Sequence, residues 1–113
     1  MTVGDIYWIE LPPNMGHEQS GRRPAVIVQD EASVGILPVV LAVPLTTATS
    51  TLRFPGTLRI QPGTENGLSH LSVALVFQLR AVDRRRLGGR IGAVGSGALA
   101  EIFAVLDKLM GRS

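Results

Sequence analysis

The chain has 113 residues and no cysteine, and its net charge of +2 comes from ten arginines and one lysine against nine acidic residues. This length suits one domain with one core, and the lack of cysteine excludes a disulfide framework, a thiolate zinc site and a cysteine nucleophile. We therefore expect a single domain over residues 1–113, in a reducing compartment such as the cytoplasm. The longest apolar run, residues 34–45, contains two prolines and is too short to span a bilayer, so no membrane association is expected.

Several short apolar segments are predicted to be strands. Residues 6–11 are rich in β-branched and aromatic side chains and end at two prolines, which is typical of a first strand. After a polar loop, further strands are predicted at residues 24–29, 37–45, 52–60 and 72–80, each bounded by Gly, Pro, Asn or Ser. Residues 39–43 and 73–76 are apolar on both faces, as expected of central strands.

The C-terminal segment has the period of a helix. Its apolar residues recur every three or four positions, with Ser96 or Gly97 placed as the N-cap and Gly111 as the terminator. Residues 83–87 are predicted to form one short helical turn before a strand at residues 91–94. Many short strands and one helix predict a mainly β fold, a small, strongly curved antiparallel sheet or partly open barrel with the helix packed on it. The apolar stripe consists of Leu99, Ile102, Phe103, Leu106, Leu109 and Met110.

The segment at residues 18–24 is a polar turn that ends in two arginines and a proline, directly before an apolar run. Pro24 has no amide hydrogen and a fixed φ, so it can begin a strand and hold the Arg23 guanidinium at the mouth of that strand. This position is suited to binding a phosphate.

A second group of arginines lies at residues 80–90, where five arginines accompany one acidic residue. The planar guanidinium suits bidentate phosphate contacts, so the segment favours nucleic acid or an acidic peptide as partner. For the run Arg84, Arg85 and Arg86, a solvent-exposed turn explains the charges equally well.

The two arginine-containing segments occur in a fixed order with residues 4–8, 43–47, 66–69, 72–78 and 82–88. This order is that of the MazF/PemK family of toxin endoribonucleases, which the chain resembles over nearly its whole length. The resemblance implies an SH3-like barrel, a homodimer and sequence-selective cleavage of single-stranded RNA, including mRNA, by its own 2′-hydroxyl. The expected products carry a 2′,3′-cyclic phosphate and a 5′-hydroxyl. It also implies a cognate MazE-like antitoxin, whose acidic, extended C-terminal segment binds over the RNA site.

No metal or other cofactor is expected, because the chain has two histidines, no cysteine and no carboxylate pair with the spacing of metal ligands. By the resemblance, Arg23 stabilises the phosphorane and Thr46 fixes the scissile phosphate, while Glu18 orients Arg23 or the 2′-hydroxyl. Taken alone, Arg23 could instead form a surface salt bridge, and the Thr46 hydroxyl could cap its own backbone. The remaining candidates, for binding RNA, are Gln19, Thr47, Phe77, Gln78, Arg80, Arg84, Arg85 and Arg86.

Two residues depart from the family pattern. His17 stands where relatives often have a small polar residue, and we expect it to be an exposed loop residue rather than a base. Phe77 replaces a common acidic residue, and it either packs in the core or stacks on an unpaired base. Tyr7 and Trp8 are expected in core or dimer packing, and His70 in a hydrogen bond to the backbone.

Two other functions remain open at this stage. A toxin of the same fold could bind a protein such as DNA gyrase without cutting RNA. A barrel of this type could also hold RNA as a plain binding module.

Overall fold

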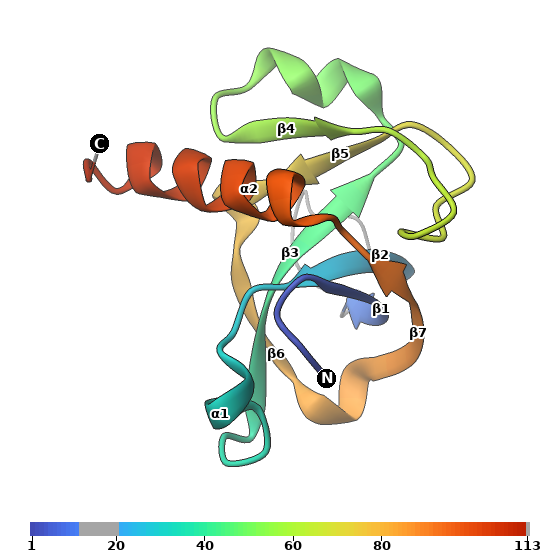
Figure 1. Cartoon of the computed structure of the whole chain (residues 1–113), viewed down its shortest axis with the longest axis vertical. Helices are drawn as coiled ribbons and strands as arrows, with labels where there is room; N and C mark the ends of the chain where they lie inside the picture. The colour runs from blue at the N-terminus through green and yellow to red at the C-terminus, as the bar shows by residue number, and fades with distance from the viewer. Residues whose placement is uncertain (12–20, 113) are drawn as a thin grey trace.

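The computed structural model describes residues 1–11 and 21–112, and its strands form one antiparallel sheet (Figure 1). Neighbouring strands follow the path β4-β5-β3-β2-β1-β7, and β6 pairs with the first half of β3. The strands are β1 (Asp5–Leu11), β2 (Gly21–Ile27), β3 (Val39–Thr46), β4 (Thr57–Ile60), β5 (Ser72–Leu75), β6 (Arg80–Asp83) and β7 (Leu87–Ala93). The helices are α1 (Glu31–Val34) and α2 (Ser96–Leu109), and the 3₁₀ turns are η1 (Thr49–Arg53), η2 (Val76–Gln78) and η3 (Arg84–Arg86).

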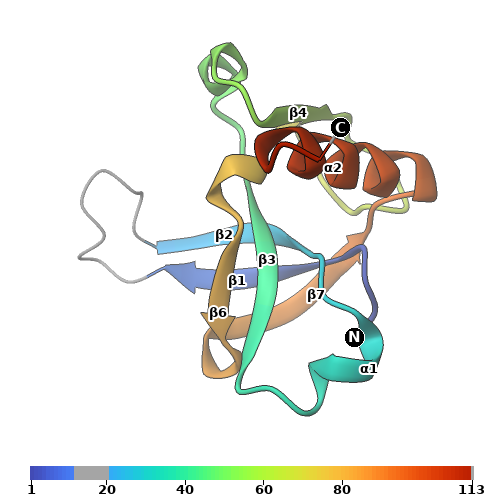
Figure 2. The same cartoon turned by 90° about the vertical axis from the view of Figure 1, so that its left-hand side faces the viewer.

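The sheet is strongly curved and open. Figure 2 shows β3 crossing the direction of β1 and β2. Within the described residues, no pairing joins β4 to β7 at the two ends of the path. The prediction of a mainly β, partly open barrel with a C-terminal helix is therefore confirmed. No helix in the described part of the chain is long and apolar enough to cross a membrane.

The core lies on both faces of the central strands. On β2, Val26 packs into one apolar cluster, and Ala25 and Ile27 pack into a second one on the other face. Such double burial explains why the central strands lack the alternation of a half-exposed strand. Ile102 of α2 is fully buried in the first cluster, and the helix runs beside β4 and η2 (Figure 1).

Two predicted strands differ from the observed ones. The single strand predicted at residues 72–80 is wrong, because η2 divides it into β5 and β6, which pair with opposite ends of β3. The η2 turn lies opposite the part of β3 between these two pairings, which includes Pro44. Because Pro44 has no amide hydrogen to donate, β3 cannot form a continuous ladder of hydrogen bonds there. The strand predicted at residues 52–60 is also shorter, because η1 takes its first part and β4 begins only at Thr57.

The remaining differences concern element ends. β2 begins at Gly21, before the proline that was expected to open it, so Arg22 and Arg23 lie within the strand. The short helix α1 was not predicted. The predicted turn at residues 83–87 is confirmed as η3, and the predicted last strand begins earlier, at Leu87. The predicted helix is confirmed as α2, which is followed by Gly111 at a φ of +73°. Its predicted N-cap is wrong, because Gly95 holds that position and Ser96 and Gly97 lie within the helix.

Candidate active site

The pairing of β2 with β3 brings Arg23 and Thr46 to the same place. The two strands pair as Ala25 with Pro44, Val26 with Val43 and Ile27 with Ala42. Extending this register by two residues places Thr46 opposite Arg23. The ladder stops before that point because Pro24, which would face Leu45, has no amide hydrogen to donate. The strand ends therefore separate where the two candidate residues lie.

A cavity of about 210 Å³ occupies this separation, and we call it the β2–β3 cavity. Arg22 and Arg23 are the cationic residues of its lining, and none of the described lining residues is acidic. Thr46, Thr47 and Ser72 add three hydroxyl groups to the lining. A cavity lined by cations and hydroxyls is suited to an anion such as a phosphodiester. The full lining is Arg22, Arg23, Pro24, Leu45, Thr46, Thr47 and Ser72.

The Thr46 side chain is buried and held in one orientation. Its Oγ1 accepts a hydrogen bond from the Ala48 amide at 3.1 Å, so the expected local capping does occur. Because a hydroxyl has one hydrogen and two lone pairs, this bond leaves the O–H of Thr46 able to donate to a ligand. Capping and ligand binding are thus compatible at this residue.

Sequence reasoning missed two residues of the cavity. Arg22 was passed over in favour of its neighbour, although both arginines line the space. Ser72 is buried at the start of β5, where its Oγ donates to the His70 carbonyl at 3.1 Å. The sequence held one signal for Ser72, namely its place at the start of a predicted apolar strand. In the structure, the next residue of that strand, Val73, pairs with Thr46.

The run Arg84, Arg85 and Arg86 forms η3, outside the β2–β3 cavity. Asp83 precedes the turn and accepts from the Arg85 amide at 2.9 Å and from its Nη2 at 2.8 Å. These hydrogen bonds from Arg85 lower the pKa of Asp83 to about 2, and the carboxylate raises the pKa of Arg85 in turn. Arg84 donates to the Val34 carbonyl at the end of α1. Two of the three arginines therefore have structural partners.

Arg86 lines two other cavities. It lines a cavity of about 150 Å³ that also contains Trp8 and Arg22, and a neighbouring one with Glu10, Asp83 and Arg85. Arg85 lines both cavities too, but its side chain pairs with Asp83.

Phe77, Gln78 and Arg80 do not line the β2–β3 cavity. Phe77 is 44% exposed and makes an edge contact with Phe54, with 6.0 Å between the ring centroids. Gln78 ends η2, whereas Arg80 begins β6 opposite Ala42. Gln78 and Arg80 therefore do not lie on one continuous strand, in contrast to the strand predicted at residues 72–80.

Three candidate loop residues, His17, Glu18 and Gln19, lie outside the described residues. Within residues 1–11 and 21–112, no group of three or more His, Asp or Glu side chains could hold a metal ion. For the part of the chain that the structure describes, the chemistry of the β2–β3 cavity thus depends on guanidinium and hydroxyl groups.

The chain is similar in sequence to known proteins. A family model described as "PemK-like, MazF-like toxin of type II toxin-antitoxin system" matches residues 2–110. The chain is 30% identical to Endoribonuclease MazF of Staphylococcus epidermidis over 96% of this chain and 89% of that protein. It is 30% identical to Endoribonuclease EndoA of Bacillus subtilis over 78% and 75% of the two chains.

Solved structures agree with the sequence matches. The fold is similar to the crystal structure of MazF from Deinococcus radiodurans, with a TM-score of 0.82, 29% identity, and coverage of 98% of this chain and 96% of that one. It is also similar to a chain of the MazE-MazF crystal structure from the same organism, with a TM-score of 0.77, 29% identity, and coverage of 100% and 97%.

Proposed function

The chain belongs to the family of PemK-like, MazF-like toxins of type II toxin–antitoxin systems, and from this membership we propose that it is an endoribonuclease that cleaves single-stranded RNA. The observation that carries the proposal is the shared lining of one cavity by Arg23 and Thr46, which come from different strands. The names of the relatives, endoribonucleases in two bacterial genera, support the same activity.

In the proposed reaction the scissile phosphodiester lies in the β2–β3 cavity. The 2′-oxygen of the RNA loses its proton and attacks phosphorus, the bond from phosphorus to the 5′-oxygen breaks, and that oxygen gains a proton. The products carry a 2′,3′-cyclic phosphate and a 5′-hydroxyl. The nucleophile belongs to the substrate, so the protein has to stabilise the extra negative charge of the phosphorane.

Arg23 is the group proposed for this stabilisation. A guanidinium offers several N–H donors in a fixed fork, and preorganised donors of this kind are each worth about 3 kcal/mol in the transition state. A guanidinium stays protonated across the physiological pH range, which makes it a poor base but a permanent cation. Thr46 then donates its O–H to a phosphate oxygen, with its oxygen oriented by the Ala48 amide.

Other roles follow from the family. We assign Glu18 to orient Arg23 or the 2′-hydroxyl. Contacts to neighbouring nucleotides are assigned to Gln19, Thr47, Phe77, Gln78, Arg80, Arg84, Arg85 and Arg86. Among the last three, Arg86 is the strongest candidate, since Arg84 and Arg85 have partners within the protein.

The proposed partners are a second copy of the chain and a MazE-like antitoxin. A MazE-MazF assembly is named for a similar structure, and an acidic peptide can occupy a site built for a phosphate backbone. Exposed apolar side chains such as Leu41, Phe54 and Phe103 offer surface for a homodimer. We propose that the enzyme acts in the cytoplasm, where mRNA is translated.

The test is cleavage of a long RNA of known sequence by the pure protein in EDTA, followed by sequencing and end analysis of the fragments. We expect cuts in unpaired regions, with cyclic phosphate and 5′-hydroxyl ends. Arg23→Ala should remove the cuts, while Arg59→Ala, a change on β4 outside the cavities described, should keep them. RNA that is bound but left intact would contradict the proposal, and so would activity that requires a divalent metal.

A further inference from the structure

A second cavity of about 210 Å³ adjoins the β2–β3 cavity, and we call it the Trp8 cavity. The two share Pro24, Thr47 and Ser72, so they are parts of one continuous surface. A nucleic acid strand with a phosphate in the first cavity would bring an adjoining nucleotide to the second. The Trp8 cavity is lined by Trp8, Pro24, Thr47, Gly67, Leu68, Ser69, His70, Ser72 and Ile91.

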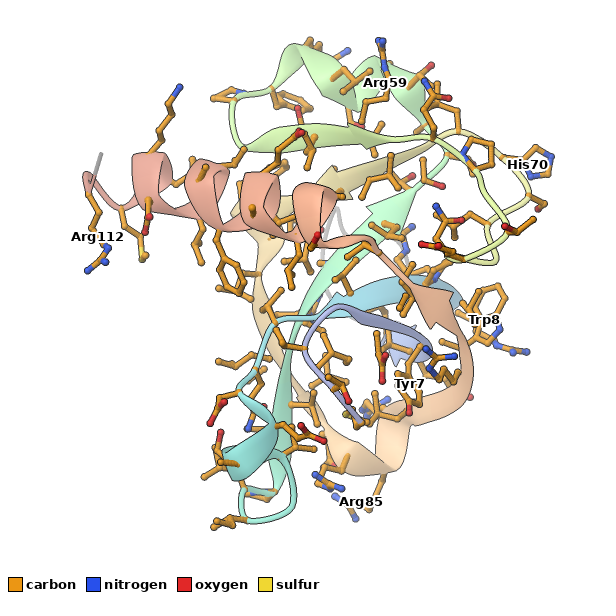
Figure 3. All side chains as sticks on the ribbon, in the orientation of Figure 1. Tyr7, Trp8, Arg59, His70, Arg85 and Arg112 are labelled. Carbon is orange, nitrogen blue, oxygen red and sulfur yellow. The ribbon has the colours of Figure 1, made fainter. Side chains whose placement is uncertain are left out.

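Trp8 provides an aromatic wall and is not part of the core. Tyr7 packs against the second core cluster, as the sequence predicts, whereas neither cluster of described residues includes Trp8. The guanidinium carbon of Arg22 lies 4.3 Å from the centroid of the indole ring. Figure 3 shows Trp8 and His70 projecting from the same side of the molecule. Because Arg22 also lines the β2–β3 cavity, it links the aromatic wall to the proposed phosphate site.

The opposite wall is a turn held tightly against β7. A Cβ added at Gly67 would come within 2.3 Å of the Ile91 carbonyl oxygen, and one at Gly92 within 2.5 Å of the Asn66 backbone. The Ala93 amide also donates to the Glu65 carbonyl at 3.0 Å. Only glycine permits this approach, so the turn packs directly on β7, which pairs with the strand that carries Trp8.

Polar groups of this turn line the cavity. Ser69 Oγ and His70 Nδ1 are hydrogen-bonded at 3.0 Å, which orients the imidazole and leaves its Nε2 on the far edge of the ring. Hydroxyl and imidazole groups can each donate or accept, as required to read the edge of a base. An indole beside such groups is the usual composition of a site for one unpaired base, which binds by stacking and by hydrogen bonds at its edge.

We infer that the Trp8 cavity is a nucleobase subsite next to the scissile phosphate, in which the base stacks on Trp8 and the pair Ser69 and His70 reads its edge. The inference rests on the proposed endoribonuclease function and adds to it the residues that select one nucleotide. Arg22 acts as a positioning residue that braces the indole. A stacked base must leave any double helix, so this subsite also confines cleavage to single-stranded RNA.

The first test compares base preference at the cut. A random-sequence RNA pool is cleaved by the wild type, by His70→Ala and by the control Thr64→Ala, a change on the same turn but outside the Trp8 cavity, and the new ends are sequenced. We expect His70→Ala to relax the preference at one position beside the cut and to keep it elsewhere, with Thr64→Ala unchanged. A preference that is the same at every position in all three proteins would overturn the inference.

The second test measures stacking. Trp8→Leu should lower kcat/KM by about 5- to 100-fold, the usual range for losing base–aromatic stacking, and Trp8→Phe should restore part of it. Ile36→Ala, a change at an exposed apolar residue outside the cavities described, is the control. A loss within about twofold for Trp8→Leu, with native circular dichroism, would overturn the subsite.

The third test avoids mutation. Trp8 is the single tryptophan of the chain, so intrinsic fluorescence reports on this cavity alone. A short RNA of the cleaved sequence, with deoxyribose at the nucleotide before the cut, should quench Trp8 as it binds. Binding detected by anisotropy of a labelled RNA without quenching would contradict the inference. If the wild type cuts no RNA at all, the proposed function fails instead, which separates the two failures.

Discussion

Two arginine-rich regions of this molecule were both predicted from the sequence to bind RNA, but their arginines have different surroundings in the structure. At the start of β2, Arg22 and Arg23 line a cavity together with three hydroxyl side chains. In η3, Arg84 donates to the Val34 carbonyl and Arg85 pairs with Asp83. The number of arginines is greater in η3, yet the cavity has the arrangement suited to chemistry. The location of a guanidinium relative to other donors therefore matters more than the local charge.

The largest difference between the regions is expected from Arg23. Replacing Arg23 with alanine removes the donors that face the phosphorane, so kcat should fall by at least about 100-fold with little change in melting temperature. Arg23→Lys keeps the charge without the fork and should recover only a small part of the rate. The measurement is single-turnover cleavage of a defined RNA, with Arg59→Ala as the control. A loss of less than about threefold would remove Arg23 from the mechanism.

The next effect is expected from the hydroxyl in the same cavity. Thr46→Val keeps the shape of the side chain but loses its donor, so kcat should fall by about 10- to 100-fold. The variant should also be less stable by about 1 kcal/mol, because the Ala48 amide loses its acceptor. Thr46→Ser should keep most of both properties. If valine and serine are equally active, the hydroxyl has no part in cleavage.

A smaller effect is expected in η3, and it should change binding rather than chemistry. Arg86→Gln should raise KM by a few fold at low salt and leave kcat unchanged, since a surface cation attracts the RNA backbone without touching the reacting atoms. The slope of log kcat/KM against log salt should fall by about one unit or less. A change in kcat without a change in the salt slope would show that Arg86 takes part in catalysis instead.

The smallest effect is expected at Asp83 and concerns stability. Its pKa of about 2 lies below the ordinary value of 3.8, so the carboxylate stabilises the fold above pH 4 and loses this contribution as the pH falls toward 2. Asp83→Asn should lower the melting temperature at pH 7 by no more than a few degrees, because the pair with Arg85 is solvated. The difference should vanish near pH 2. Equal melting temperatures at pH 7 would show that the pair contributes nothing.

Much of the fold could be predicted because its signals are local. The helical spacing of Leu99, Ile102 and Leu106 and the glycine at position 111 define α2 without any tertiary information. The short apolar segments likewise define most strands. The division of residues 72–80 by η2 could not be predicted in this way, because it depends on two separate pairings along β3.

The candidate site likewise has a part that could be predicted from local sequence and a part that could not. The motifs around Arg23 and Thr46 are readable, and their spatial meeting follows from the β2–β3 register once that register is known. Trp8 was predicted to pack in the core or in a dimer interface, and neither core cluster of the described residues includes it. Its exposure in a cavity results from a long-range arrangement, in which Gly67 and Gly92 let a distant turn approach β7. No local pattern contains that information.

The central claim is that Arg23 and Thr46 act on one phosphate, and a double-mutant cycle tests it most directly. Single-turnover cleavage rates are compared for the wild type, Arg23→Ala, Thr46→Val and the double variant in EDTA. If the two groups serve one transition state, the double variant should lose far less than the product of the two single losses. Losses that multiply fully would show independent action at separate places and would contradict the account.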